Sequence, residues 1–159
     1  MSDQAVILLA EDREDDILLI RRAFRSAFLD NPLQTVRDGE ECIAYLAGIG
    51  KFSNRAEYPL PDLLLLDLKM PRIDGFEVLL WLRQQPTLSS LRVIVVTSSE
   101  ALRDVNRAYQ LGASSFMVKP TDFENYVVIS KFISNFLSMS KAPGIARPPK
   151  VQEPAPSSD

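Results

Sequence analysis

The chain has 159 residues, of which 46% are hydrophobic and 25% are charged, and its formal net charge is −3 at pH 7. This length and composition predict one globular domain, and the acidic balance argues against nucleic acid or an anionic membrane as the main partner. The sequence contains no histidine. A Ser-His-Asp triad, a Cys-His pair and a histidine zinc site are therefore excluded, so any chemistry must use carboxylates, hydroxyls, lysines or a hard metal ion.

The N-terminal residues show no signal-peptide pattern, and no apolar run is long enough to span a bilayer. The single cysteine, Cys42, cannot form an internal disulfide and suits a reducing compartment. We therefore expect a cytoplasmic protein whose partners are neither membranes nor nucleic acids.

The first part of the chain alternates strand patterns with helix patterns. Residues 5–9 are a short apolar run typical of a buried strand, and residues 33–36 form a weaker one. Apolar residues repeat at helical spacing over residues 17–28 and again over residues 40–46. Residues 48–61 contain two glycines and two prolines, which indicates an extended loop. Loops of this length inside a compact domain more often serve binding than mere connection.

The centre of the chain is the stretch Asp62–Gly75, in which four consecutive leucines predict a strand buried on both faces. Helix and strand patterns then alternate: a helix at 76–82, a strand at 93–96, a helix at 100–111 and a strand at 115–118. A last helix, capped by Thr121 or Asp122, runs to about residue 137. Five repetitions of strand then helix predict an α/β fold, a three-layer, doubly wound, five-stranded parallel sheet.

The composition changes at Ser138, and five of the eleven prolines fall in the last seventeen residues. Such a segment cannot bury enough apolar surface to fold. We therefore predict a domain over residues 1–138 and a disordered, proline-rich tail over residues 139–159.

Each strong strand ends in a polar residue: Glu11 and Asp12 follow the first, Asp67 the third, Thr97 the fourth and Lys119 the fifth. Any one of them alone could be a helix cap or a solvated side chain. The carboxyl ends of parallel strands lie along one edge of a sheet, so we expect all five to converge. Two carboxylates about 4 Å apart repel by roughly 4 kcal/mol at an effective dielectric of ~20, which favours a cation between them.

Oxygen ligands without histidine or cysteine select Mg²⁺ over zinc. A carboxylate beside Mg²⁺, with a lysine and a hydroxyl within reach, can be the nucleophile of a phosphoryl transfer. Asp67 would attack the phosphorus, Lys119 and the metal would neutralise the developing charge, and Thr97 would bond a phosphoryl oxygen.

These motifs resemble the receiver domain of two-component response regulators. Four motifs carry the resemblance: ED after the first strand, LDLKMPRIDG from the last residue of the third strand, VVTSS, and FMVKP. The resemblance covers about residues 5–137. It implies a flavodoxin-like, CheY-like fold with strand order 2-1-3-4-5. It also implies that a histidine kinase phosphorylates Asp67.

The resemblance further implies roles for individual residues. The implied Mg²⁺ ligands are Glu11, Asp12, Asp67 and the backbone carbonyl of Lys69. Thr97 matches the switch hydroxyl of the family and Phe116 the switch aromatic residue. The Lys119–Pro120 peptide bond matches one that is usually cis in the family.

A narrower resemblance is to the small, single-domain response regulators that partner bacterial and cyanobacterial phytochromes. It rests on the loop GIGKFSNRAEYPLPDL, on TSSE after the fourth strand, on KPTDFENY, and on the lack of an output domain. It implies that the partner is a sensor histidine kinase of the phytochrome type.

The last predicted helix is more apolar than a surface helix requires, because its apolar residues cover more than one face. They are Tyr126, Val127, Val128, Ile129, Phe132, Ile133, Phe136 and Leu137. Such a helix is either deeply packed or forms a contact surface. We expect a homodimer through the fourth and fifth helices and the fifth strand.

Three other functions fit parts of the pattern. A phosphate-ester hydrolase with an aspartyl nucleophile usually has a second Asp two residues later, where this chain has Lys69. A flavin-binding module would need a phosphate loop after the first strand, where this chain is acidic. A receiver-like protein-interaction module could act without phosphorylation. We expect a phosphorylated signalling protein that is not an enzyme.

Overall fold

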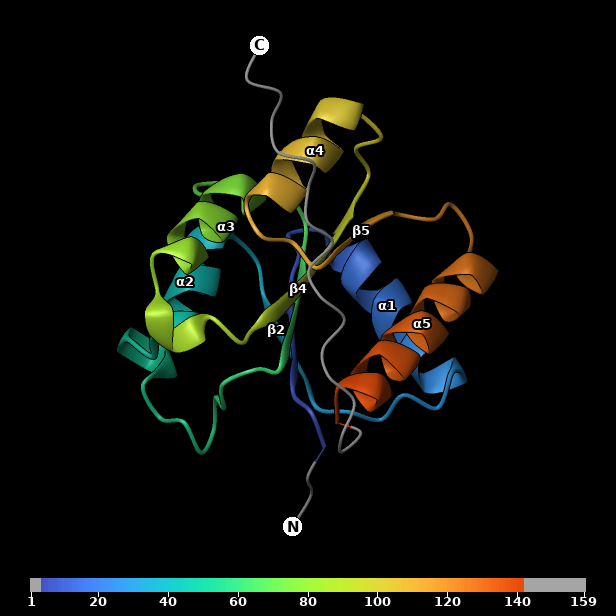
Figure 1. Cartoon of the computed structure of the whole chain (residues 1–159). Coiled ribbons are helices and arrows are strands. Elements are labelled where there is room, and N and C mark those ends of the chain that lie inside the picture. The colour runs from blue at the N-terminus through green and yellow to red at the C-terminus, as the bar shows by residue number, and fades with distance from the viewer. Residues whose placement is uncertain (1–3, 142–159) are drawn as a thin grey trace.

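Five parallel strands form the middle layer of the molecule, in the order β2-β1-β3-β4-β5 (Figure 1). The strands are β1 (Ile7–Ala10), β2 (Leu33–Val36), β3 (Leu63–Leu66), β4 (Arg92–Thr97) and β5 (Ser115–Val118). The computed structural model describes residues 4–141. Within that range the predicted α/β class, parallel sheet and strand order are confirmed.

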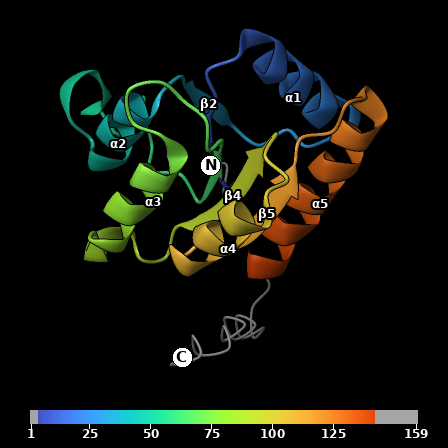
Figure 2. The same cartoon turned by 90° about the horizontal axis from the view of Figure 1, so that it is seen from above.

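Two layers of helices cover the sheet. The helices are α1 (Glu14–Ser26), α2 (Gly39–Ala47), α3 (Gly75–Arg83), α4 (Leu102–Gln110) and α5 (Phe123–Lys141), with short 3₁₀ turns η1 (Gly50–Phe52) and η2 (Pro86–Leu88). One face of the sheet carries α1 and α5, and the other carries α2, α3 and α4 (Figure 2). Helix α5 continues three residues past the predicted boundary at residue 138. The rest of the predicted tail, residues 142–159, lies outside the described residues.

Strands β1, β3 and β4 bury both of their faces, which explains their nearly continuous apolar sequences, whereas the edge strands β2 and β5 are only partly buried. Alternate residues point to opposite layers. The core beneath α1 and α5 contains Ile7, Leu9, Leu63, Leu65, Ile94 and Val96. The core beneath α2, α3 and α4 contains Leu8, Ala10, Leu64, Leu66, Val93 and Val95. Helix α4 contributes little to this second core, because its one fully buried side chain is the small Ala108.

Aspartates begin three of the helices. The side chains of Asp38, Asp74 and Asp122 each accept a hydrogen bond from the backbone N–H three residues further on, at 2.7 to 2.9 Å. Gly75 follows one of these caps, and a Cβ atom there would lie 2.4 Å from the carbonyl oxygen of Asp67. Asp74 is therefore the N-cap of α3, and the close approach of the two backbone segments requires glycine at residue 75.

The predicted loop at residues 48–61 packs against the end of α2. The Arg55 guanidinium donates to the carbonyl oxygens of Tyr45, Leu46 and Tyr58, at 2.7, 2.9 and 3.1 Å. The rings of Tyr45, Phe52 and Tyr58 contact one another, with centroids 5.1 to 5.9 Å apart. The loop is therefore a packed element rather than an extended connection.

Two smaller expectations have different outcomes. The Lys119–Pro120 peptide bond, expected to be cis from the family resemblance, is trans. The trans isomer of an X–Pro bond is the lower in energy by about 0.5–1 kcal/mol. Among the helices of residues 4–141, none combines the length and the apolar composition that a bilayer span requires.

Candidate functional site

The register of the sheet brings the strand ends together. Ala10 pairs with Leu66, so the residues that follow them, Glu11 and Asp67, are neighbours. The backbone N–H of Asp67 donates to the carbonyl oxygen of Ala10, at 3.1 Å. On the other side of Asp67, β4 ends at Thr97, whose carbonyl oxygen accepts from the Lys119 N–H at 2.7 Å. We call this edge of the sheet the carboxyl rim.

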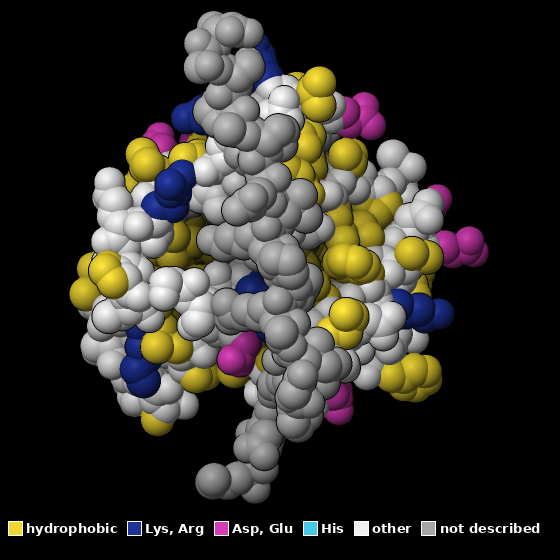
Figure 3. Space-filling view, viewed as in Figure 1, with side chains coloured by type: hydrophobic (Ala, Val, Ile, Leu, Met, Phe, Trp, Pro, Cys, Tyr) yellow, Lys and Arg dark blue, Asp and Glu magenta, His cyan; other side chains and the backbone are white. Residues whose placement is uncertain are grey.

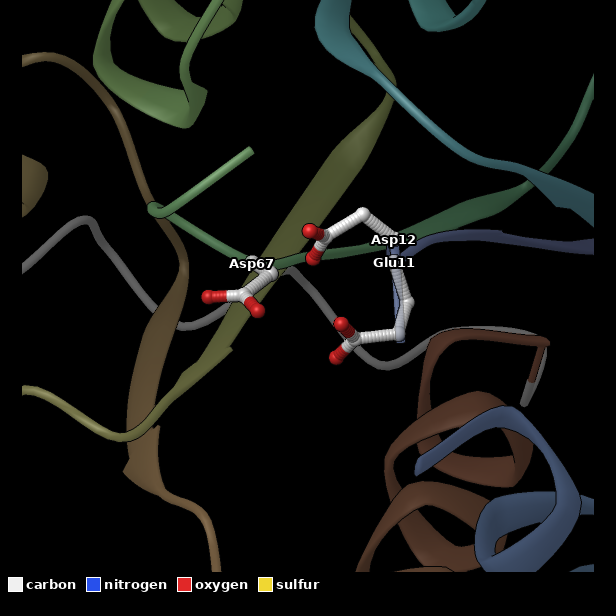
Figure 4. A group of neighbouring side chains, drawn as sticks. All are labelled: Glu11, Asp12 and Asp67. Carbon is white, nitrogen blue, oxygen red and sulfur yellow. The ribbon is translucent and has the colours of Figure 1, made fainter. Parts of the chain in front are cut away.

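Three carboxylates gather at the carboxyl rim. Glu11, Asp12 and Asp67 each offer an oxygen atom, and these atoms all lie within 4.8 Å of one another. Figure 4 shows the three carboxylates pointing into a common space. Glu11 and Asp67 are buried, whereas Asp12 is exposed. An all-oxygen donor set of this kind, with one side open to water, fits a hard divalent cation such as Mg²⁺.

Lys119 is the cation of the site, and its side chain is nearly buried. Its Nζ lies 2.6 Å from Glu11 Oε1, 2.8 Å from Asp16 Oδ2 and 2.8 Å from Asp67 Oδ2. An ammonium group has three N–H donors. All three donors of Lys119 are therefore matched by a carboxylate oxygen.

Burial and the neighbouring charges shift two pKa values at the rim. Burial, together with the nearby charge of Asp67, raises the pKa of Glu11 to about 7, against the opposing hydrogen bond from Lys119. Burial acts to lower the pKa of Lys119, but the hydrogen bonds to Asp16, Asp67 and Glu11 outweigh it and raise that pKa. The carboxyl groups of Glu11, Asp12, Asp16 and Asp67 thus lie around one nearly buried lysine, and a divalent cation would offset negative charge that the lysine does not balance.

Thr97 lies at the carboxyl rim and is fully buried. Among the buried side-chain polar atoms of residues 4–141, its Oγ1 is the one with no hydrogen-bond partner. A buried hydroxyl without a partner costs about 1–3 kcal/mol. Because Thr97 ends the strand next to β3, an unpartnered hydroxyl on this residue suits a site that takes a further oxygen-rich group.

The structure gives the positions of two further predicted residues, Lys69 and Phe116. The backbone N–H of Lys69 donates to Asp67 Oδ1 at 3.2 Å, so residue 69 is adjacent to the site. Phe116 is half-buried and packs against the core beneath α2, α3 and α4. Metal binding by the Lys69 carbonyl and a switching motion of Phe116 both stay predictions.

Asp16 is a site residue that the residue types alone do not single out, because it is one of three acidic residues in the first turn of α1, where negative charge is common in any helix. The sequence does contain a signal. Asp16 lies four residues before Ile20 and seven before Ala23, both buried, so it shares the inward-facing stripe of α1. An acidic residue in line with an apolar stripe predicts a buried partner, and that partner is Lys119.

The chain is similar to proteins of known signalling families. Residues 7–130 match the sequence profile of the response regulator receiver domain. The response regulator Rcp1 of Synechocystis sp. is 34% identical over 140 residues, which are 86% of this chain and 93% of Rcp1. A probable methanogenesis regulatory protein, FilR2 of Methanothrix harundinacea, is 32% identical over 145 residues, 91% of each chain.

Solved structures agree with these relatives. The crystal structure of the phosphorylated cyanobacterial phytochrome response regulator RcpA gives a TM-score of 0.79 at 34% identity, covering 87% of this chain and 97% of RcpA. The Mn²⁺-bound form of response regulator Rcp1 gives a TM-score of 0.76 at 32% identity, covering 91% of this chain and 99% of Rcp1. Both likenesses extend over nearly the whole of those chains.

Proposed function

Because this chain belongs to the response regulator receiver domain family, we propose that it accepts a phosphoryl group from a sensor histidine kinase on Asp67. Mg²⁺ would be held by Glu11, Asp12, Asp67 and the backbone carbonyl of Lys69. The observation that carries the proposal is the pairing of Asp67 with Lys119 beside two further carboxylates. A nucleophilic carboxylate needs this compensation of charge when a phosphoryl group approaches.

The proposed step forms an acyl phosphate. An Asp67 carboxylate oxygen attacks the phosphorus of the kinase phosphohistidine, an O–P bond forms and the P–N bond breaks. The electron pair of that bond stays on the imidazole nitrogen, which takes up a proton from water. Lys119 neutralises the charge on the phosphoryl oxygens, and the Thr97 hydroxyl donates to one of them. Mg²⁺, when bound, supplies further neutralisation of these oxygens.

The chain changes itself in this step and turns over no external substrate, so we do not assign it an enzymatic activity. Its output would be a change of surface. Thr97 gains an acceptor for its unpartnered hydroxyl, and Phe116, half-buried on the neighbouring strand, can repack in response.

We propose that the partner is a phytochrome-type histidine kinase. We expect the phosphoryl transfer between the two proteins to occur in the cytoplasm. The support is the likeness to RcpA and Rcp1 over nearly their whole lengths. FilR2, which is similar to nearly the same degree, carries a different regulatory name. Phosphotransfer from a purified phytochrome kinase therefore decides between partner classes.

We also propose a homodimer through α4, β5 and α5. Support comes from exposed apolar side chains on these elements: Leu102, Tyr109, Val118, Phe123, Val128, Phe132 and Met139. Hydrophobic side chains gather between α4 and α5 in the space-filling view (Figure 3). In sedimentation at micromolar concentration, the wild type should be a dimer and Val128→Asp a monomer, whereas Leu18→Asp on α1 should remain a dimer.

The phosphorylation proposal is tested by incubating the chain with acetyl phosphate and Mg²⁺ and then measuring its intact mass. The wild type and Asp15→Asn, which removes an exposed carboxylate, should gain one phosphoryl group. Asp67→Asn should gain none, and EDTA should prevent the gain. A wild type that stays unmodified, or an Asp67→Asn variant modified to the same extent, would contradict the proposal.

A further inference from the structure

The three acceptors around Lys119 are not equivalent. Glu11 and Asp67 belong to the carboxylate cluster that fits a divalent cation, and Asp67 is also the proposed phosphoryl acceptor. Asp16 is outside that cluster. Its Oδ2 lies 2.8 Å from Lys119 Nζ and 3.6 Å from Arg13 Nε, and the Arg13 side chain is mostly exposed. Lys119 is therefore the one buried cation that Asp16 contacts.

Asp16 also differs from the other acids in the first turn of α1. Glu14 and Asp15 are exposed, and Glu14 pairs with Arg37 at the surface. The side chain of Asp16 is 16% exposed and points toward the carboxyl rim. Its orientation follows from the inward stripe of α1, which packs beside α5 over the sheet. The helix thus fixes one acceptor of Lys119 independently of the strand ends.

A phosphoryl group on Asp67 requires a change at Lys119, because all three of its donors are already matched. One donor must leave a carboxylate oxygen to meet a phosphoryl oxygen. A lysine side chain has large rotational freedom, so an ammonium that loses its acceptors moves away from the site. The acceptor that stays in place during the reaction is the one that neither binds the cation nor takes the phosphoryl group.

We propose that Asp16 is a positioning residue: it holds the Lys119 ammonium at the carboxyl rim while Asp67 receives the phosphoryl group. The inference rests on the proposed function and assigns a role that acts entirely through Lys119. Asp16 touches neither the reacting oxygen of Asp67 nor the incoming group. It keeps the ammonium within reach of both.

The test compares Asp16→Asn with Asp15→Asn in the full chain. Each substitution removes one carboxylate charge from the first turn of α1, but only Asp16 is bonded to Lys119. At saturating Mg²⁺ and acetyl phosphate, Asp16→Asn should lower the phosphorylation rate about tenfold, the effect of one lost charge-assisted hydrogen bond. Asp15→Asn should change it by less than about twofold, and Asp16→Glu should recover most of the loss.

Three further measurements separate positioning from a purely structural effect. The dissociation constant for Mg²⁺, measured by calorimetry, should change less than about twofold in Asp16→Asn, because Asp16 is outside the metal cluster. In a Lys119→Met background, Asp16→Asn should have almost no effect on the rate. In metal-free protein, acylation of Lys119 by a soluble succinimidyl ester should be faster in Asp16→Asn than in Asp15→Asn.

The outcomes distinguish this inference from the proposed function. Equal rates and equal Lys119 acylation in Asp16→Asn and Asp15→Asn, with the wild type phosphorylated on Asp67, overturn the role of Asp16 alone. The same holds if Asp16→Asn slows the reaction equally with and without Lys119. A wild type that takes no phosphoryl group overturns the proposed function itself.

Discussion

Two cations in this molecule each collect three oxygen acceptors, at opposite ends of the fold. Lys119 follows the carboxyl end of β5 and is bonded to three carboxylates at 2.6 to 2.8 Å. Arg55 lies in the loop that leads to the amino end of β3 and is bonded to three backbone carbonyls at 2.7 to 3.1 Å. The number of contacts is the same, but the acceptors differ in kind.

The difference in acceptors separates a structural contact from an exchangeable one. Backbone carbonyls are neutral and fixed, and the rigid fork of a guanidinium matches them in one arrangement. Carboxylate side chains are charged and can rotate, and an ammonium can exchange one oxygen for another. Arg55 therefore maintains the shape of a loop, whereas Lys119 can transfer a hydrogen bond to an incoming group.

The largest effect should come from Lys119→Met. The substitution keeps an unbranched side chain of similar length but removes the charge that opposes the phosphoryl oxygens. We expect phosphorylation by acetyl phosphate to slow by about 10²-fold, a typical loss for one electrostatic contact to a reacting group. Rate constants from intact mass spectra against time provide the measurement. A rate near that of the wild type would show that Lys119 is a structural residue like Arg55.

Arg55→Ala should give the reverse pattern. Three carbonyl oxygens lose their donor, so we expect the free energy of unfolding to fall by about 2 kcal/mol. Urea denaturation measures this loss, and Arg55→Lys should restore only part of it because an ammonium lacks the planar fork. The phosphorylation rate should change by less than about twofold. If Arg55→Ala instead slowed phosphorylation and left the stability unchanged, Arg55 would not be the structural counterpart of Lys119.

Thr97→Val should give the smallest effect and the opposite sign. The substitution replaces an unpartnered buried hydroxyl with a methyl group of similar shape. We expect the unphosphorylated protein to gain about 1 kcal/mol of stability, because the desolvation cost of the hydroxyl disappears. Urea denaturation in EDTA measures the gain, and Ser130→Ala, which removes a buried hydroxyl bonded to the Tyr126 carbonyl, should lose stability instead. A loss in both variants would mean that the Thr97 hydroxyl has a partner.

The sequence predicted the sheet and most of the carboxyl rim because both depend on local patterns. Four leucines in a row can be satisfied only by burial on two faces, and a parallel sheet brings Asp67, Thr97 and Lys119 to one edge. Helix starts were less predictable. Helix α4 begins at Leu102 rather than residue 100, since the Ser99 hydroxyl bonds the Asp104 carboxylate at 2.5 Å and accepts from the Ala101 N–H.

Other features depend on contacts between distant parts of the chain. The inward orientation of Asp16 depends on the rotation of α1 about its axis, which the packing of α1 beside α5 determines. The loop at residues 48–61 has a composition typical of exposed loops. Nothing in its local sequence indicates that the Arg55 side chain would bond three backbone carbonyl oxygens, two of them in α2. The complete burial of Thr97 likewise depends on the tertiary packing around the end of β4 rather than on its neighbours in sequence.

The contact between Gly75 and Asp67 gives the molecule a stiff side and a compliant side. Where α3 begins, its backbone lies close to that of Asp67 and Leu68, and the Gly75 N–H donates to the Leu68 carbonyl oxygen at 2.9 Å, which couples this helix to the end of β3. Across the same face, α4 is anchored to the core by Ala108. We therefore expect a change at Asp67 to displace α4 more readily than α3.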